Sequence, residues 1–350
     1  MKERYDGLDG LRAISCLGII AMHIRANAEY AISGWIYDCV VPSLTLFVYL
    51  FLMISGFGMF CGYYDRFRQG SVDLNRFYAR RYGKILPFFA FLLCIDVIMD
   101  RSAAHLIEGI TEATLVFGLL PNNQPDVIGV GWTLGVIFLF YMLFPFFVFL
   151  CWNKRRAWIS LFISCVLNLF CDGYYFSGKF VIESFAPRHN FLYCAPFFII
   201  GGLIWMYRSE INAVFSSRKV ICFAVCAAVT AGFFLAARPG LETGLDLNRP
   251  GILPLILVCP WLVYAVSCPG KLLNNRIVGY LSRISLELYL AQMVVFRAFE
   301  KMHCLYLLGK GWLSFILVWI GVVAGLILFI EIWSRLWKAA IRISGRKRFA

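Results

Sequence analysis

The sequence predicts an all-α protein, a polytopic bundle of about ten transmembrane helices with both termini in the cytoplasm. Of its 350 residues, 61% are hydrophobic, only 15% are charged, and 33 are Phe. A soluble domain of this length cannot hide so much apolar surface. Apolar stretches of spanning length also recur along the whole chain. We therefore expect one integral-membrane domain over residues 1–350 and no separate soluble domain.

The candidate spans are stretches whose length and composition suit a bilayer, which a helix of about 20 apolar residues crosses. We place them at residues 11–25, 42–61, 85–99, 133–151, 157–171, 191–207, 219–236, 251–267, 281–297 and 312–334. The first and ninth are the weakest because they carry charge. The first is also short, and we expect it to lie inside the bundle.

Two longer segments separate these spans. Residues 62–84 are basic and amphipathic, which is typical of an interfacial segment on anionic lipid. Residues 104–120 carry His105, Glu108 and Glu112 three or four positions apart, which predicts an interfacial helix on the outer face. We find no cleavable signal, and the chain ends soon after its last span, so we expect no fused extracytoplasmic domain.

The net charge of +13 is explained by membrane orientation and not by nucleic-acid binding. If the N-terminus is cytoplasmic, most of the 33 Lys and Arg residues fall in cytoplasmic segments. This positive-inside bias agrees with an even number of spans. We expect no nucleic-acid partner.

The thirteen cysteines show no CxxC pair and no metal-ligand spacing, so no metal site is expected. Most of them, such as Cys222 and Cys226, lie in apolar stretches where a free thiol packs as a small hydrophobe.

The first apolar stretch contains two polar residues, Arg12 and His23. Eleven residues are about three helical turns, so both side chains share one face about 16 Å apart. Such residues cost free energy in hydrocarbon and indicate a functional site. The alternative is that Arg12 reaches the headgroups and His23 only caps the outer end.

Other polar residues have structural interpretations. We expect Asp9 to pair with Arg12 one turn away, and Ser55, Gly201 and Gly202 to serve close helix packing. Glu287 and Glu331 in later spans imply partners or a cavity.

Five motifs follow one another along the chain: LDGLR at residues 8–12 with His23 eleven residues after Arg12, SGF at 55–57, FYARRYGKILP at 77–87, GWTLGVIFLFYMLFP at 131–145 and YLSRISLELYLAQ at 280–292. In type and order they resemble the integral-membrane acyltransferase-3 family. The resemblance extends over nearly the whole chain.

The resemblance implies an enzyme that O-acylates extracytoplasmic glycans and lies in the plasma membrane as a multi-pass protein. It implies acyl-CoA as the cytoplasmic co-substrate, with acetyl-CoA the expected donor, and a hydroxyl of a surface or exported polysaccharide as the acceptor. The family's Arg and His pair maps onto Arg12 and His23. Its basic motif maps onto Arg80 and Arg81, and its Trp-Thr/Ser-Leu motif maps onto residues 132–134.

The residue types fit this chemistry. A hydroxyl is a poor nucleophile near neutral pH, and a positioned His can take its proton. We expect His23 to be this general base because it is the one His within a predicted span, whereas His105, His189 and His303 fall in outer loops. Arg12 completes the catalytic pair, and it would orient His23 through an intermediary, stabilise an oxyanion or bind a CoA phosphate.

The phosphates of CoA need a cationic site on the cytoplasmic side. Arg76, Arg80, Arg81 and Lys84 can supply it, since guanidinium groups bind phosphate oxygens in a bidentate manner. The positive-inside rule by itself would also explain this cluster.

We expect Trp132, Thr133 and Gln292 to border the substrate cleft. Two positions depart from the family pattern, because many members have Glu where this chain has Ile137 and His where it has Gln292. Gln can form hydrogen bonds but cannot titrate, so the second position lacks a proton-transfer group.

Two other classes of membrane protein share some of these sequence features. A transporter or flippase for a lipid-linked glycan would also have many spans and buried charges, but it more often shows inverted repeats, and none is visible here. A non-catalytic membrane sensor would not need a basic cluster together with a titratable group.

Overall fold

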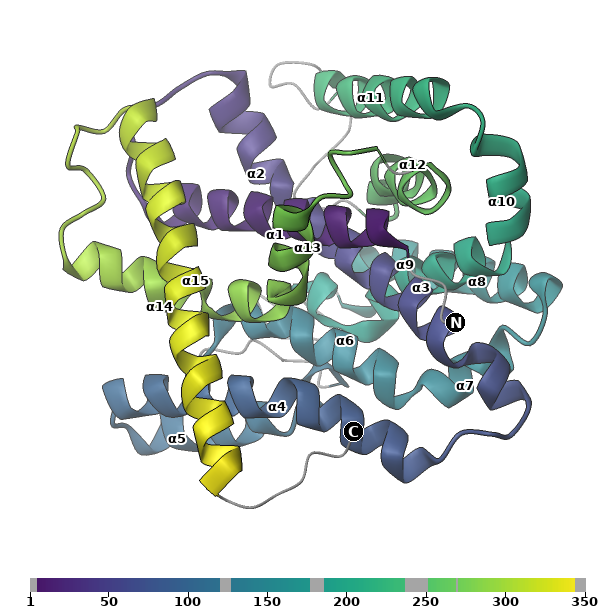
Figure 1. The fold of residues 1–350 in the computed structure, drawn as a ribbon, viewed down its shortest axis with the longest axis horizontal. Coiled ribbons are helices and arrows are strands. Elements are labelled where there is room, and N and C mark those ends of the chain that lie inside the picture. Colours follow the sequence, from purple (N-terminus) through teal and green to yellow (C-terminus); the bar gives the residue numbers. More distant parts are fainter. Residues whose placement is uncertain (1–4, 120–126, 177–185, 237–250, 269, 344–350) are drawn as a thin grey trace.

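The computed structural model describes residues 5–119, 127–176, 186–236, 251–268 and 270–343, and this part of the chain is helical without β-strands (Figure 1). The helices are α1 (Asp6–Asn27), α2 (Val41–Ser43), α3 (Phe47–Arg68), α4 (Leu74–Met99), α5 (Ala103–Ala113), α6 (Trp132–Met142), α7 (Phe144–Leu150), α8 (Lys154–Phe170), α9 (Phe191–Met206), α10 (Arg208–Phe215), α11 (Lys219–Ala236), α12 (Pro254–Ser267), α13 (Arg276–Arg283), α14 (Ser285–Lys301) and α15 (Trp312–Ile343). The predicted all-α class is confirmed.

Each predicted span coincides with a helix or a pair of helices. Among the described residues, four helical segments are long and apolar enough to cross a membrane: Asp6–Asn27, Ile36–Arg68, Leu74–Met99 and Trp312–Arg342. Two bent pairs, α6 with α7 and α9 with α10, raise this number to six if each is one span. The chain is thus built as an integral membrane protein, and ten spans stay a prediction.

The stretch 133–151 was predicted as one helix and is instead bent by 62° between α6 and α7. Pro145 lies in the first turn of α7. It has no N–H to donate to the carbonyl four residues earlier, and its ring crowds that carbonyl, so the helix is interrupted just before it.

The stretch 281–297 is also divided, at Ile284 between α13 and α14. The carbonyl of Ser282 accepts a hydrogen bond from the Ser285 hydroxyl at 2.9 Å. A side-chain donor at this point competes with the regular helical ladder, and the chain turns here.

The basic segment 62–84, predicted to be interfacial, is shared between two helices. Helix α3 continues to Arg68, and α4 begins at Leu74, where the Asp73 carboxylate accepts the backbone N–H of Arg76 at 3.1 Å. A side chain that satisfies a free N–H at a helix start fixes the boundary. The predicted outer amphipathic helix is present as α5, which ends at Ala113.

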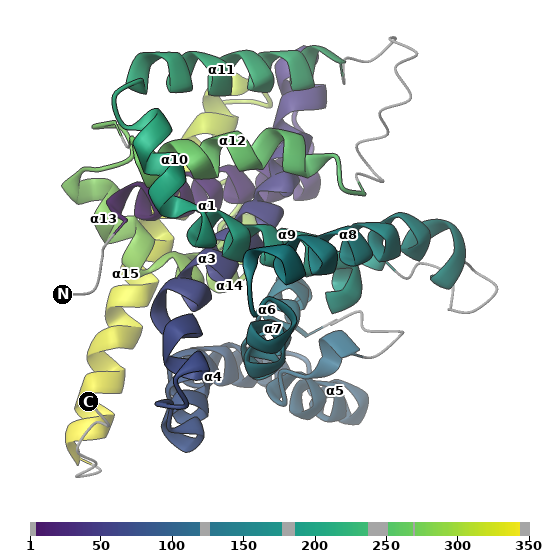
Figure 2. The ribbon, with the colours of Figure 1, turned by 90° about the vertical axis from the view of Figure 1, so that its right-hand side faces the viewer.

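Helix α1 lies near the middle of the molecule in both views, in contact with α3, α12, α13 and α14 (Figures 1 and 2). Of its most apolar window, 61% is buried, against 28% for α4 and 33% for α15. The prediction that this first helix sits inside the bundle is confirmed.

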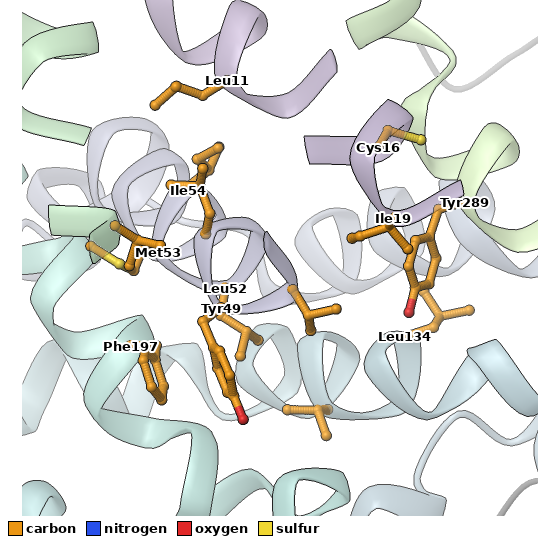
Figure 3. Packing of buried hydrophobic residues seen from close by; sticks show 14 of the residues in the cluster. Leu11, Cys16, Ile19, Tyr49, Leu52, Met53, Ile54, Leu134, Phe197 and Tyr289 are labelled. Carbon is orange, nitrogen blue, oxygen red and sulfur yellow. The ribbon is translucent and has the colours of Figure 1, made fainter. Parts of the chain in front are cut away.

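Helices α3 and α9 form the tightest helix pair. A Cβ added to Gly56 would lie 2.1 Å from the Phe198 carbonyl oxygen, and one added to Gly201 would lie 2.1 Å from that of Met53. Glycines thus let the two backbones approach, as small residues do between membrane helices. The packing interpretation of Gly201 is confirmed, and stacking of Tyr49 on Phe197 continues the contact (Figure 3).

Segments predicted on the same side of the membrane contact one another. On the predicted inner side, Lys154 pairs with Glu210, and the Tyr64 hydroxyl donates to the Trp152 carbonyl at 2.9 Å. On the predicted outer side, the Tyr30 hydroxyl donates to the Leu305 carbonyl at 3.2 Å. The fold is therefore compatible with the predicted alternation of loops.

Candidate active site

A cavity of about 290 Å³ lies between α1, α3, α4, α6, α13 and α14. Four cationic side chains line it: Arg12, Arg81, Lys84 and Arg283. Its walls also carry hydroxyl groups of Ser, Thr and Tyr residues together with apolar side chains. A concave, largely apolar site with a few convergent polar groups is typical of a small-molecule pocket.

The five sequence motifs all contribute to this cavity. LDGLR supplies Arg12, SGF supplies Ser55, and the basic motif supplies Arg81 and Lys84. The motifs at 131–145 and 280–292 supply the remaining polar walls, including Thr133 and Tyr289. Residues as far apart in the sequence as Arg12 and Tyr289, which are 277 positions apart, thus meet at one place.

Arg12 is fixed by a triangle of hydrogen bonds. Its Nη1 donates to Asp9 Oδ1 at 2.9 Å and to Ser282 Oγ at 3.1 Å, and Ser282 Oγ in turn donates to the same Asp9 oxygen at 2.8 Å. The predicted Asp9 ion pair is confirmed. Because Ser282 belongs to α13, the triangle also ties α1 to the turn before α14.

Arg81 is held by aromatic rings. Its guanidinium carbon lies 5.0 Å from the ring centres of both Tyr63 and Tyr141, within the range of cation–π attraction. The buried Nε of Arg81 has no hydrogen-bond acceptor among the described residues. A buried donor without an acceptor is costly unless a ligand supplies one.

Arg76 and Arg80 were predicted with Arg81 and Lys84 as one cationic cluster, and they do not line the cavity. Both side chains are exposed. Successive residues of an α-helix point about 100° apart, so Arg80 and Arg81 point in different directions. The neighbouring helices decide which of these directions faces a cavity.

Thr133 and Tyr289 come together in the cavity wall. Their hydroxyl oxygens are 2.8 Å apart, and both residues are almost fully buried. Ile19 of α1 and Leu134 of α6 lie beside the Tyr289 ring (Figure 3). Gln292 does not line the cavity; its Nε2 donates to the Tyr289 carbonyl at 2.8 Å and so braces that turn of α14.

His23 lies outside the cavity lining, one helical turn beyond Ile19 on α1. The guanidinium of Arg188 is close enough to interact electrostatically with the His23 ring. The same charge acts on Tyr289. The described residues offer the His23 ring no hydrogen-bond partner, so the ring is held by packing and not by a network.

Trp132 stands at the start of α6, next to Thr133. Its ring stacks on His189, with centroids 4.6 Å apart, and the Arg188 guanidinium lies 5.6 Å from it. Trp132 is 8% exposed, so its faces are already covered by protein. Trp132, Arg188, His189 and His23 form what we call the outer cluster.

Ser55 and Glu331 have hydrogen-bond partners, whereas the buried Oε2 of Glu287 accepts no hydrogen bond from the described residues. Ser55 accepts a hydrogen bond from the Tyr141 hydroxyl at 3.4 Å, and none of the cavity-lining residues is a His that would activate it. Glu331 accepts a hydrogen bond from Tyr280 at 3.0 Å, and the charge of Lys84 acts on Glu287. Ile137 lines the cavity, so the wall at this departure from the family pattern is apolar.

Sequence reasoning missed Ser282, Arg283, Tyr289 and Arg188 as members of the site. The signal for the first two was visible, because SRIS places polar residues inside an apolar stretch. Tyr289 also lies within the motif at 280–292, but nothing in that motif distinguishes it from Tyr280. Arg188 lies in none of the five motifs. In the described part of the chain, no group of His, Cys, Asp and Glu has the arrangement of a metal site.

The chain is similar in sequence to known acyltransferases. A family model described as an acyltransferase domain matches residues 5–332. The O-acetyltransferase OatA of Staphylococcus aureus is 34% identical over 187 residues, which cover 47% of this chain and 28% of that protein. The putative peptidoglycan O-acetyltransferase YrhL of Bacillus subtilis is 25% identical over 187 residues, with the same coverage.

An uncharacterized protein of Haemophilus influenzae is 25% identical over 196 residues, which cover 49% of this chain and 78% of that protein. The matched segment thus spans less than a third of the OatA and YrhL chains. No solved structure is significantly similar to this chain.

Proposed function

This chain belongs to the acyltransferase 3 family, and on that premise we propose that it is a membrane O-acyltransferase. It moves an acyl group from cytoplasmic acyl-CoA to a hydroxyl of an extracytoplasmic glycan. The observation that carries the proposal is the meeting of five separate motifs at one cavity lined by four cations.

The cationic residues bind the donor. CoA carries a pyrophosphate and a 3′-phosphate, and Arg12, Arg81, Lys84 and Arg283 offer guanidinium and ammonium donors to such oxygens. The buried Nε–H of Arg81 gains the acceptor that it lacks. The acyl arm lies in the cavity, and the phosphates lie against the cations of its wall.

Arg12 takes the phosphate-binding role among the three that its sequence position allows. It lines the same cavity as the other three cations. It is also about 16 Å, or three helical turns, from His23, too far to orient that ring directly.

His23 acts as general base from the outer cluster. A ring without a hydrogen-bond partner among the described residues is available to an acceptor hydroxyl that approaches beside Arg188. The Thr133–Tyr289 pair then lies between the donor in the cavity and the acceptor at the outer cluster. Both residues line the cavity, and the charge of Arg188 in the outer cluster acts on Tyr289.

Acetyl is the acyl group that we propose, with acetyl-CoA as the donor. The printed names of OatA and YrhL, both O-acetyltransferases and one a putative peptidoglycan enzyme, support acetyl and a cell-surface glycan. Ten spans, cytoplasmic termini and a place in the plasma membrane complete the proposal. The contacts among predicted inner loops and among predicted outer loops support that topology.

The decisive experiment supplies membranes containing the full chain with radiolabelled acetyl-CoA and isolated cell-wall glycan. The wild-type chain should label the glycan, and His23→Ala should lower labelling by a factor of about 100 to 10,000, the usual contribution of a general base.

The matched control is His303→Asn. His303 lies in an outer turn with φ of 56°, a conformation that Asn tolerates, so this variant should label at the wild-type rate. A glycan that stays unlabelled with the wild-type chain, but crosses the membrane, would favour the transporter interpretation instead.

A further inference from the structure

The hydroxyl groups of Thr133 and Tyr289 share one place in the cavity wall. Their oxygens are 2.8 Å apart, and the two residues are 2% and 6% exposed. Resting on the function proposed above, we propose that these two hydroxyls bind the oxyanion that forms when the thioester carbonyl is attacked.

The spacing suits this task. Two donor oxygens 2.8 Å apart can both lie 2.7–3.1 Å from a third oxygen, the range required of oxyanion donors. Each hydroxyl carries one proton. In this arrangement one proton serves the bond between the pair, and both protons turn toward the oxyanion when it forms.

The surroundings strengthen such donors. Leu134 and Phe51 are apolar neighbours in the cavity wall, and the Phe51 ring stands edge-on to Tyr289 at 6.0 Å. In a site of low dielectric, a fixed hydrogen-bond donor stabilises charge more than it does in water. The positive charge of Arg188 acts on Tyr289 from the outer cluster and favours an anion at this place.

The pair is also held from outside. The amide of Gln292 braces the Tyr289 backbone, and Thr133 lies in the first turn of α6, where Trp132 is packed against His189. The two oxygens are thus fixed before the reaction, and only the hydroxyl protons turn while charge develops.

Acyl transfer passes through a tetrahedral intermediate whose oxygen carries the negative charge. His23 takes the proton of the acceptor hydroxyl, the oxygen forms a bond to the thioester carbon, and the C=O electron pair moves to the carbonyl oxygen. The Thr133 and Tyr289 hydroxyls donate to that oxygen. The C=O bond then re-forms, the C–S bond breaks, and the leaving thiolate takes the proton from the His23 imidazolium.

The test compares two analogues of acetyl-CoA that cannot transfer an acetyl group. S-(3,3,3-trifluoroacetonyl)-CoA has a strongly hydrated ketone and mimics the tetrahedral oxyanion, whereas S-acetonyl-CoA keeps a plain ketone. Tyr289→Phe and Thr133→Val, in the full chain in detergent, should each weaken binding of the trifluoro analogue about 100-fold or more. Binding of the plain ketone should change less than about threefold, because that ketone carries no oxyanion.

Two further variants separate this role from folding damage. Thr133→Ser keeps the hydroxyl and should restore tight binding of the trifluoro analogue. Tyr49→Phe removes another buried hydroxyl on which Arg188 also acts, outside the cavity lining, and should bind both analogues as the wild-type chain does.

Equal losses for the two analogues, or no loss for either, would overturn the oxyanion assignment. So would an acetyl group recovered covalently on Tyr289. If the wild-type chain binds neither analogue and labels no glycan, the proposed function itself fails. This outcome can be told apart from failure of the oxyanion assignment, because it is seen in the wild-type chain and needs no variant.

Discussion

Arg81 shows at the scale of single residues how packing selects one cation from a basic segment. Its guanidinium is enclosed by the rings of Tyr63, Phe77 and Tyr141, while its sequence neighbour Arg80 points to the surface. Aromatic faces stabilise the guanidinium without occupying its in-plane N–H donors. Arg81 is therefore prepared to bind an anion in the cavity.

We expect Arg81→Gln to raise the KM for acetyl-CoA about 10- to 100-fold, the effect of losing one charge-assisted hydrogen bond. The measurement is the initial rate of acetyl transfer against acetyl-CoA concentration. Arg80→Gln is the matched comparison and should raise the same KM clearly less. Equal rises in KM for the two variants would instead support the four-residue cationic cluster predicted from the sequence.

At the scale of elements, α5 is attached to the end of α4 by a titratable contact. His105 Nε2 lies 2.8 Å from Asp96 Oδ2, and His105 Nδ1 lies 3.9 Å from Asp100 Oδ2. The hydrogen bond with Asp96, followed by the charges of Asp100, Asp96 and Glu108, raises the pKa of His105 above its ordinary value. A protonated His105 thus ties the two helices together.

The sign of the pH dependence follows from this raised pKa. The contact stabilises α5 fully below about pH 6.5, the ordinary pKa of His, and the stabilisation is lost as pH rises through the higher value of the folded state. Amide hydrogen exchange of residues in α5 should therefore be slower at pH 5.5 than at pH 8.5, after correction for intrinsic rates. Asp96→Asn should remove most of this difference, and a pH response unchanged in that variant would contradict the assignment.

At the scale of the whole molecule, the cavity exists because six helices from distant parts of the chain enclose it. Gly58 of α3 is part of its wall, and a Cβ there would meet nothing within 4 Å. Gly62, one turn further along α3, also has open space but does not line the cavity. The two glycines are thus a matched pair that differ in position relative to the site.

We expect Gly58→Leu to weaken acetyl-CoA binding about tenfold or more, because the new side chain fills part of the 290 Å³. Gly62→Leu should bind as the wild-type chain does. Both changes favour the helix, since Leu exceeds Gly in helix propensity by about 0.8 kcal/mol, so neither should prevent folding. Thermal unfolding in detergent tests whether both variants are folded. Equal acetyl-CoA binding by both variants would show that the donor lies elsewhere.

The sequence alone predicted the all-α membrane class and the segments that carry the site, and each predicted span coincides with a helix or a pair of helices in the described part of the chain. Apolar length, the positive-inside bias and side-chain chemistry are local properties, and they can be read without knowing any neighbour. They identified Arg12, Arg81 and Lys84, and the resemblance to the acyltransferase-3 family added Thr133; all four residues line the cavity. They also placed His23 on the same helix as Arg12.

Only the tertiary structure decided which face of each helix meets which partner. It divided two predicted spans, turned Arg76 and Arg80 to the surface, and brought Tyr289 against Thr133 across 156 positions of sequence. The physical reason is that a helix repeats its faces every 3.6 residues whatever surrounds it. The face that lines a cavity is chosen by the packing of other helices, and no single segment contains that information.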